Sequence, residues 1–448
     1  DRNGVIQVLS SKGLLHPFYG AMLYPGTLAP DDTYRPMKDK KISNFSIYRN
    51  QLVYLDDKAV LSNAWAGSLY IKHGLANARV FTGGSDFDFL VSDGSALRYL
   101  KGAQALWESK STERVLDMIF DSARHRFLVL TPAQIFSFSP EDKNYSSFFA
   151  ADSLTCFTIA NGGKDVVAGT RNGYMVIDAA TGKQKGEVIR KLPCPQLTAV
   201  TEIGGKLWFG SGNGAFMLKE DGRFNYYASK RWLPSDDVKH IAKGDGYSVL
   251  VLTGAGLGKI GFMQMTLEEK AAFYDKQVRL RHIRYGLYCD VANLEHGNLS
   301  TAGLRPRDSD NLWTAMYMGS QLFRYLVTHE AEAKQNCIES FEAMERLYTI
   351  HSIPGFFARS FERRGIMPFK NEYRPYLQHY WYPGYQNTIS WHHAADTEWD
   401  WKGAASSDQT VGQMFALTLL AQYMDDEGIK KRAIALMDGL MSHIIDHQ

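Results

Sequence analysis

The sequence predicts a multidomain protein in which an N-terminal β-propeller is followed by an all-α domain of the α/α toroid type. Two observations predict the propeller: a glycine-containing motif recurs at intervals of about 40 residues, and short β-rich runs flank each glycine. A third observation predicts the second domain, because the hydrophobic pattern changes to helical spacing at Met265. The predicted domains are therefore residues 1–265 and 266–448.

The repeat is clearest at three glycine turns. Asn172–Gly173 and Asn213–Gly214 lie 41 residues apart, Gly254–Gly256 follows at a similar interval, and weaker copies occur at Ser92–Gly94 and Thr131–Ala133. An Asn-Gly pair between apolar runs favours a two-residue hairpin turn in which both positions take positive φ. Each repeat is therefore expected to contain about four short strands, as one propeller blade does.

Six blades are expected to begin near residues 43, 78, 114, 152, 196 and 237. Residues 1–36 are expected to complete one more blade, so that strands from both ends of the domain close the ring. Seven blades are thus favoured, with six as the alternative. The copy from Lys206 to Val238 resembles the propeller repeat of two-component sensor ectodomains. Because propellers serve as platforms, ligand binders and enzymes, that likeness implies no activity.

The second domain opens with a helix signal. Thr266 is followed three residues later by Glu269, which is a capping box and predicts a helix from Leu267 to about Arg284. Further helices are expected where apolar residues recur at helical spacing, over 312–326, 333–347 and 429–444. Residues 411–423 are apolar nearly all round, which predicts a helix buried on most sides.

Buried and amphipathic helices thus alternate, as inner and outer helices do in an (α/α)6-type toroid. Residues 266–448 would supply only the first half of such a toroid. The remainder is therefore expected in a longer chain, of which this one is a fragment, or in a separate chain that acts as a partner.

Composition excludes several classes of protein. The net charge is +2 and no stretch is rich in Lys or Arg, so there is no electrostatic footprint for nucleic acid. No window approaches the ~18 apolar residues of a membrane span. Cys156, Cys194, Cys289 and Cys337 form no Cys-x-x-Cys pair, which argues against a zinc ribbon or redox motif and predicts mostly buried free thiols. The chain opens at Asp1 without an apolar leader, which indicates a mature or trimmed terminus.

Polar and aromatic residues gather in the loops that precede the predicted inner helices, at 304–313, 353–364 and 391–409. Loops that enter inner helices line the mouth of a toroid, and the free N–H groups of helix ends favour an anionic ligand. Arginines in these loops suit a carboxylated sugar, because a guanidinium group binds a carboxylate with two parallel hydrogen bonds. The alternatives are surface salt bridges for the arginines, core packing for the aromatics, and helix N-caps for Ser309 or Asp310 and Ser406 or Ser407.

The sequence gives little sign of a metal site. Asp308 and Asp310 resemble the start of a calcium loop, but Leu312 occupies the position where a third ligand would help. His392 and His393 lack the i, i+4 spacing of a helical zinc pair, so one of them is better interpreted as a general base. No cofactor is therefore expected, and calcium at Asp308 and Asp310 is the weak alternative.

Three stretches resemble one group of bacterial proteins that pair an N-terminal β-propeller with a C-terminal α/α toroid. They are Arg305–Thr314, Phe341–Leu347 with Ile353–Phe361, and Trp401–Gly403 with Ser406–Asp408. The group includes the L-rhamnose-α-1,4-D-glucuronate lyases, polysaccharide lyase family 27, which act on arabinogalactan side chains. The likeness spans roughly residues 280–448, and the propeller resembles the group by its architecture.

The chain departs from the group at three positions. Relatives carry acidic residues where this sequence has Leu312, Ala404 and Gln409. The departures weaken the calcium hypothesis and any role for those positions.

The resemblance implies β-elimination at terminal L-rhamnose-α-1,4-D-glucuronate linkages, which leaves a 4,5-unsaturated glucuronate. It also implies an acidic plant-type polysaccharide as partner, and export to the periplasm or surface of a Gram-negative bacterium.

In that reaction a base removes the proton at C5 of glucuronate, and cationic groups stabilise the enolate-like intermediate. His392 fits the base by its intrinsic pKa, whereas Lys402 would need a lowered pKa. The expected catalytic residues are His392, Lys402, Tyr317 as acid, and Arg359 on the carboxylate. The expected substrate-binding residues are Arg305, Arg307, Asp310, Asn311, Trp313, Trp401 and Asp408.

Two other functions fit the same residues. A glycoside hydrolase on the toroid would need two carboxylates flanking the bond, for which Asp310 and Asp408 are the candidates. A glycan-binding or sensor ectodomain without catalysis would use the propeller for recognition, and would not need Arg359 or Lys402.

Overall fold

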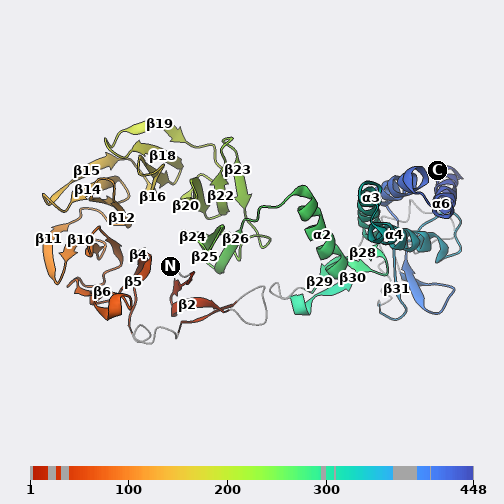
Figure 1. The fold of residues 1–448 in the computed structure, drawn as a ribbon, viewed down its shortest axis with the longest axis horizontal. Helices are drawn as coiled ribbons and strands as arrows, with labels where there is room; N and C mark the ends of the chain where they lie inside the picture. Colours follow the sequence, from red (N-terminus) through yellow and green to blue (C-terminus); the bar gives the residue numbers. More distant parts are fainter. Residues whose placement is uncertain are drawn as a thin grey trace, which may run out of the picture. The chain divides into compact units, whose positions relative to one another are not determined.

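The structure, a computed structural model, describes residues 4–18, 27–31, 40–293, 299–306, 309–366, 391–403 and 405–446. The chain divides into two compact units, Asp1–Gln264 and Met265–Gln448. This division lies one residue from the predicted domain boundary. Among the described residues, the first unit contains strands and one short 3-10 helix, Trp65–Gly67, whereas the second contains five α-helices and short strands. Figure 1 shows this change from strands to helices along the chain.

The first unit is a β-propeller of antiparallel meander sheets (Figure 1). In chain order the sheets contain β1 (Val8–Ser10), β2 (Gly13–Phe18) and β3 (Thr27–Pro30); β4 (Asn44–Tyr48), β5 (Gln51–Leu55), β6 (Ala59–Leu61) and β7 (Tyr70–Lys72); β8 (Val80–Gly83), β9 (Asp88–Ser92), β10 (Ala96–Lys101) and β11 (Gln104–Lys110); β12 (Asp117–Asp121), β13 (Arg126–Leu130), β14 (Gln134–Ser139) and β15 (Asn144–Ala150); β16 (Leu154–Ala160), β17 (Asp165–Thr170), β18 (Gly173–Asp178) and β19 (Gln184–Ile189); β20 (Leu197–Ile203), β21 (Lys206–Ser211), β22 (Gly214–Leu218) and β23 (Phe224–Tyr227); and β24 (Val238–Lys243), β25 (Ser248–Thr253) and β26 (Gly256–Gly261).

The first strands of consecutive sheets, from β4 to β24, contact one another, so these are the inner strands of the propeller. They begin at residues 44, 80, 117, 154, 197 and 238, each within three residues of the predicted start of a blade. The blade spacing read from the glycine turns is therefore confirmed.

The glycine turns differ in detail from the prediction. In the turn between β17 and β18, Gly173 has a φ of 107°, but Asn172 is not among the residues with positive φ. The Thr170 hydroxyl holds the turn instead, because its Oγ1 accepts the N–H of Asn172 at 2.9 Å and donates to the carbonyl of Gly173 at 2.9 Å. A Cβ at Gly173 would lie 2.3 Å from the carbonyl oxygen of Ile189, so only glycine fits.

The N-terminal strands do not join the last sheet in the part of the chain that the structure describes. Strands β1–β3 pair only with one another, and β24–β26 form a separate sheet. A blade that mixes strands from both ends of the domain is therefore not seen. The N-terminal sheet is joined instead to the next one, since Tyr54 Oη donates to Gln7 Oε1 at 2.7 Å and Gln7 Nε2 donates to Asp31 Oδ2 at 2.6 Å.

The second unit contains α2 (Leu267–Arg281), α3 (Asp310–Thr328), α4 (Ala331–Thr349), α5 (Ser407–Tyr423) and α6 (Glu427–Asp446). The capping box of α2 is confirmed, because Thr266 Oγ1 accepts the N–H of Glu269 and the Glu269 carboxylate accepts the N–H of Thr266. The helix ends three residues before the predicted Arg284. There the chain turns at Tyr285 and Gly286, both with positive φ, into a hairpin of β27 (Ile283–Arg284) and β28 (Leu287–Tyr288).

Helices α3 and α5 pack side by side with the same direction. A Cβ at Gly412, early in α5, would meet Leu312, early in α3, whereas one at Gly319 would meet Phe415 further along α5. The first turns of both helices therefore lie at the same end of the unit. Helix α5 is less buried than predicted, because Val411 is 67% exposed and Phe415 is 40% exposed.

All four cysteines are buried and free, which confirms that prediction. Within the described ranges, none of the helices combines the length and the apolar character that a membrane crossing requires.

Candidate functional site

A small antiparallel sheet carries two of the four predicted catalytic residues, His392 and Lys402. It contains β31 (Ser360–Arg363), β33 (Trp399–Lys402) and β32 (Trp391–His393), in that order. Residues opposite one another across strands share a face, and faces alternate along each strand. The register therefore places one set of side chains on a polar face: Ser360, Glu362, Asp400, Lys402, Trp391 and His393. The other, aromatic face holds Phe361, Trp399, Trp401, His392 and Arg363.

On the polar face, His393 is held by a buried carboxylate. His393 Nδ1 lies 2.7 Å from Asp400 Oδ1, and Asp400 is fully buried whereas the His393 side chain is 59% exposed. In the tautomer that donates Nδ1–H to this carboxylate, Nε2 is the ring nitrogen that can accept a proton. The N–H of Gly365 and the Arg364 guanidinium also contact Asp400, at 3.2 and 3.6 Å. This is the arrangement of an oriented general base.

One predicted cationic residue, Lys402, lies next to this pair, and the main chain of a second, Arg359, lies beside Lys402. Lys402 is on the same face as His393, in the neighbouring row of the sheet. Arg359 precedes β31, and its N–H donates to the carbonyl of Lys402 at 2.7 Å. The main chains of Arg359 and Lys402 are therefore adjacent.

Asp408 belongs to the same neighbourhood. It lies in the first turn of α5, where the Ser406 hydroxyl donates to its carboxylate. That hydrogen bond, together with the positive charge of Arg359, holds the pKa of Asp408 below its ordinary value. Asp408 is thus a stable anion near neutral pH rather than an acid that could donate a proton.

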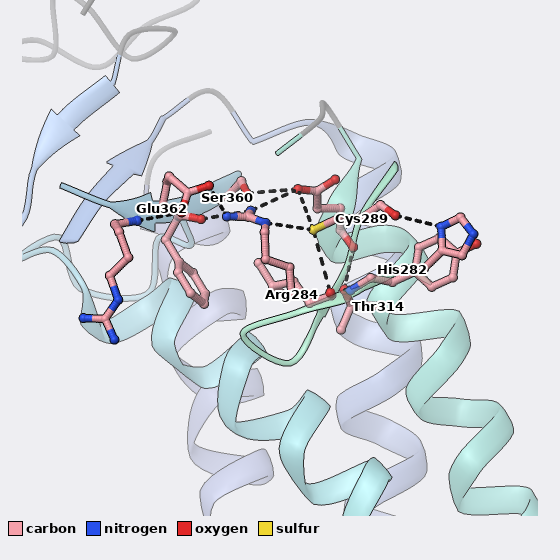
Figure 2. Close-up of polar contacts among 11 residues, drawn as sticks. His282, Arg284, Cys289, Thr314, Ser360 and Glu362 are labelled. Carbon is pink, nitrogen blue, oxygen red and sulfur yellow. Dashed lines mark hydrogen bonds and ion pairs between the residues drawn. The ribbon is translucent and has the colours of Figure 1, made fainter. Parts of the chain in front are cut away.

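Two residues of the polar face, Ser360 and Glu362, belong to a buried ion-pair network (Figure 2). Arg284, from β27, donates to the Glu362 carboxylate and to the carbonyl of Phe361. The Arg284 guanidinium is also 3.9 Å from Asp310 Oδ2, which accepts the Ser360 hydroxyl at 3.1 Å. The network therefore joins the hairpin, the small sheet and the first turn of α3.

Cys289 completes the network. Its Sγ lies 3.6 Å from Asp310 Oδ2 and 3.4 Å from Arg284 Nε. Burial, followed by the charge of Asp310, raises the pKa of the Cys289 thiol to about 12. The thiol therefore stays protonated and serves as a structural hydrogen-bond donor.

The network corrects the expectations for Asp310 and Asn311. Asp310 is 1% exposed and its carboxylate is committed to buried partners, while Asn311 is fully buried. Neither side chain is placed to contact a polysaccharide, and Asp310 is not placed to bind calcium. Arg307 and Asp308 lie outside the described residues. Among the residues that the structure places, no three His, Cys, Asp or Glu side chains gather as a metal site would require.

Trp401 and His392 lie on the aromatic face, away from Lys402. Trp401 is 7% exposed, and its ring stacks on His392 at 4.5 Å between centroids and packs against His351 at 4.7 Å. Trp401 is therefore a core residue rather than a platform for sugar. The expectation that His392 is the base is also corrected, because the neighbouring histidine, His393, shares a face with Lys402.

His351 makes the stability of this aromatic cluster dependent on pH. Burial lowers the pKa of its ring from 6.5 to about 4, and its Nδ1 accepts the N–H of Ile353. Between pH 6.5 and about pH 4, the His351 ring is protonated in the unfolded chain but stays neutral in the folded protein. We therefore expect the free energy of unfolding to fall as pH drops through that window, by at most about 2–3 kcal/mol because the ring is partly exposed.

Urea unfolding of the wild type and of His351→Phe, followed between pH 7.5 and 4, measures this effect. Phenylalanine keeps the packing against Trp401 but cannot titrate, so the variant should lose less stability on acidification than the wild type. Parallel pH profiles for the two proteins would contradict the assignment.

Three other predicted residues, Trp313, Tyr317 and Arg305, lie at or beside a pocket in the same unit, apart from the small sheet. Trp313 and Tyr317, on α3, face α2 and line an open pocket together with Tyr288 and Asp290. Arg305 stands opposite Asp290 where β29 (Asp290–Ala292) pairs with β30 (Gly303–Arg305). The expectation that Tyr317 acts as the acid beside Lys402 is corrected, because carboxylates and the guanidinium of α2 surround its hydroxyl.

Asp400 and Glu362 were not predicted as site residues, and His392 was predicted as the base in place of His393. A signal was present, because Trp399 and Trp401 alternate with Asp400 and Lys402, which is the pattern of a strand with one polar face. Pairing that strand with Trp391–His393 would have placed His393 opposite Asp400.

Comparison with known proteins leaves the function open. No family model matches the chain, and no curated protein matches it. The extracellular domain of a hybrid two-component system from B. thetaiotaomicron is similar in structure, with a TM-score of 0.47 and 15% identity over 59% of this chain. This chain covers 38% of that one, so it spans less than half the length of that relative.

The solved structures of two lyases are similar to this chain to a comparable degree. A streptogramin B lyase has a TM-score of 0.45 and 12% identity, over 58% of this chain and 90% of its own. The virginiamycin B lyase from Staphylococcus aureus has a TM-score of 0.41 and 14% identity, over 58% of this chain and 95% of its own. Because all three TM-scores lie below 0.5, the propeller assignment rests on the sheets described above, and these likenesses carry no argument about activity.

Proposed function

We propose that this protein is a polysaccharide lyase that acts on a uronate residue by β-elimination. The observation that carries the proposal is the His393–Asp400 pair on the polar face that also carries Lys402. A C5 proton becomes acidic enough to remove only when the adjacent carboxylate is neutralised. We assign this role to Lys402, which shares a face of the sheet with His393, and to Arg359, whose main chain pairs with that of Lys402.

In the proposed reaction, His393 Nε2 takes the proton from C5 of glucuronate while Arg359 and Lys402 bind the carboxylate. The electron pair of the C5–H bond forms the C4=C5 double bond, and the C4–O4 bond breaks. The imidazolium of His393 returns its proton to O4, so that one residue serves as base and then as acid. Asp400 stabilises the imidazolium by ion pairing and keeps the ring oriented.

The substrate proposed from the resemblance is the terminal L-rhamnose-α-1,4-D-glucuronate linkage of arabinogalactan-type glycans. Incubation with gum arabic tests both the substrate and the reaction type. An elimination product gains ultraviolet absorbance from its new double bond as rhamnose is released. Release of rhamnose without that absorbance would indicate a hydrolase, and binding without any release would indicate a glycan-binding or sensor domain.

The hydrolase alternative has less support from the site. It would need Asp310 and Asp408 on either side of the bond, with one of them protonated. Asp310 is buried in ion pairs, and the pKa of Asp408 is lowered by Ser406 and Arg359. Neither carboxyl group is therefore suited to the role of general acid.

Three further proposals concern the toroid, the number of blades and the location of the protein. The α3–α4 and α5–α6 pairs belong to an α/α toroid whose remaining hairpins are supplied by a longer chain or a partner chain. The propeller has seven blades, which the seven sheets of its described residues support. The protein is exported to the periplasm or cell surface of a Gram-negative bacterium, which fractionation of the producing cells would test.

A further inference from the structure

The pocket beside Trp313 and Tyr317 in the helical unit is open and has a volume of about 480 Å³. Its walls come from α2, α3, β28 and β29, and are formed by Val278, Tyr288, Asp290, Trp313, Met316 and Tyr317. Its size falls within the range of sites that hold small ligands. Trp313 is 46% exposed and Met316 is 57% exposed, so a ligand that covers them removes apolar surface from water.

One aromatic wall of this pocket is fixed in place by two contacts. The Tyr288 ring lies parallel to the His282 ring at 5.1 Å between centroids, and the Tyr288 N–H donates to Thr314 Oγ1 at 2.8 Å. His282 is fixed in turn by a hydrogen bond of 3.0 Å between its Nδ1 and the carbonyl of Cys289 (Figure 2). A wall that is ordered before binding loses little conformational entropy when a ligand arrives.

The polar groups of the pocket favour a neutral ligand. The Asp290 carboxylate lines it, with Arg305 opposite in the strand pair. Burial and then the negative charge of Asp275 raise the pKa of Tyr317, which shows that a carboxylate also acts on the inner wall. The acidic groups Asp290, Asp275 and Glu339 are matched by Arg279 and Arg305, so the pocket offers no excess of positive charge to an anionic ligand, whereas hydroxyl groups can donate to Asp290.

We propose that this pocket binds a neutral sugar residue, whose C–H face stacks on the Trp313 indole while its hydroxyls donate to Asp290. A sugar ring is apolar on its faces and polar at its edge, which matches aromatic walls with a carboxylate. The inference deepens the proposed function, on which it rests for the choice of polysaccharide. It assigns the uronate to Arg359 and Lys402, and a neutral residue to the Trp313 pocket.

The test uses gum arabic whose glucuronate carboxyls have been reduced to alcohols, so that the cationic site has no anion to bind. Calorimetric titration of the full chain with this neutral polymer should show binding. Trp313→Ala should weaken it about tenfold or more, and Asp290→Ala should weaken it severalfold. Trp232→Ala is the matched control, since Trp232 is 44% exposed on the propeller, and it should leave the affinity unchanged.

Failure of this proposal can be told apart from failure of the proposed function. No binding of the reduced polymer by the wild type, or equal binding by wild type and Trp313→Ala, would overturn the pocket proposal, even if intact gum arabic is still cleaved. Binding that depends on Trp313, without elimination from intact gum arabic, would support the pocket and overturn the lyase. Thermal unfolding of each variant checks that it is folded.

Discussion

Replacing Arg284 with methionine is expected to destabilise the helical unit by about 3–5 kcal/mol. Arg284 is the cation between two buried carboxylates, and the side chains of Glu362 and Asp310 are 4% and 1% exposed. Methionine fills similar volume but leaves both carboxylates in the protein interior without a countercharge. They must then become protonated or draw water into the unit, and either response favours unfolding.

Chemical unfolding followed by tryptophan fluorescence measures this loss, with the propeller and the helical unit fitted as separate transitions. Lys430→Met is the matched control. Lys430 pairs with Glu427 one turn away on α6, at a surface where the carboxylate is 75% exposed, so its loss should cost less than about 0.5 kcal/mol. A similar small cost for Arg284→Met would show that the network does not hold the hairpin and the sheet together.

Replacing His393 with alanine is expected to lower kcat for elimination by about 10²–10⁴-fold, the usual contribution of a general base. Asp400→Asn should also lower kcat strongly, because an amide can donate to Nδ1 and thereby move the ring proton to Nε2. The measurement is the rate of double-bond formation with gum arabic at several substrate concentrations.

His392→Phe separates this prediction from a general effect on the sheet. Phenylalanine preserves the stack on Trp401, and His392 lies on the other face, so kcat should stay within about threefold of the wild type. A large loss in His392→Phe with little loss in His393→Ala would reverse the assignment of the base.

Much of the propeller could be predicted because its signals are local. In four sheets a Thr or Ser followed by a glycine turn forms the hairpin between the second and third strands. The spacing of these turns predicted the blade starts to within three residues. The φ values of Asn172 and Gly173 were less predictable, because a side-chain hydroxyl and the close carbonyl of Ile189 select the turn. The contact with Ile189 comes from β19, a neighbouring strand that the sequence around Gly173 does not specify.

The site was harder to predict because it depends on pairing between distant segments. Glu362 and Arg284 are 78 residues apart in the chain, and nothing around either residue indicates a buried partner. The residue types at 391–402 pointed to the right segment, but the choice between His392 and His393 depends on which face of β32 meets Asp400. A shift of one residue in register exchanges the two faces, so the register decides which histidine is the candidate base.

The most direct test of the central claim is the mass of the uronate end that remains after rhamnose leaves a short rhamnosyl-glucuronate oligosaccharide. Elimination predicts a 4,5-unsaturated end that is lighter by one water molecule than a hydrolysed end, formed by the wild type and not by His393→Ala. A saturated glucuronate end in the wild-type reaction, or the unsaturated end formed at the same rate by His393→Ala, would contradict the account.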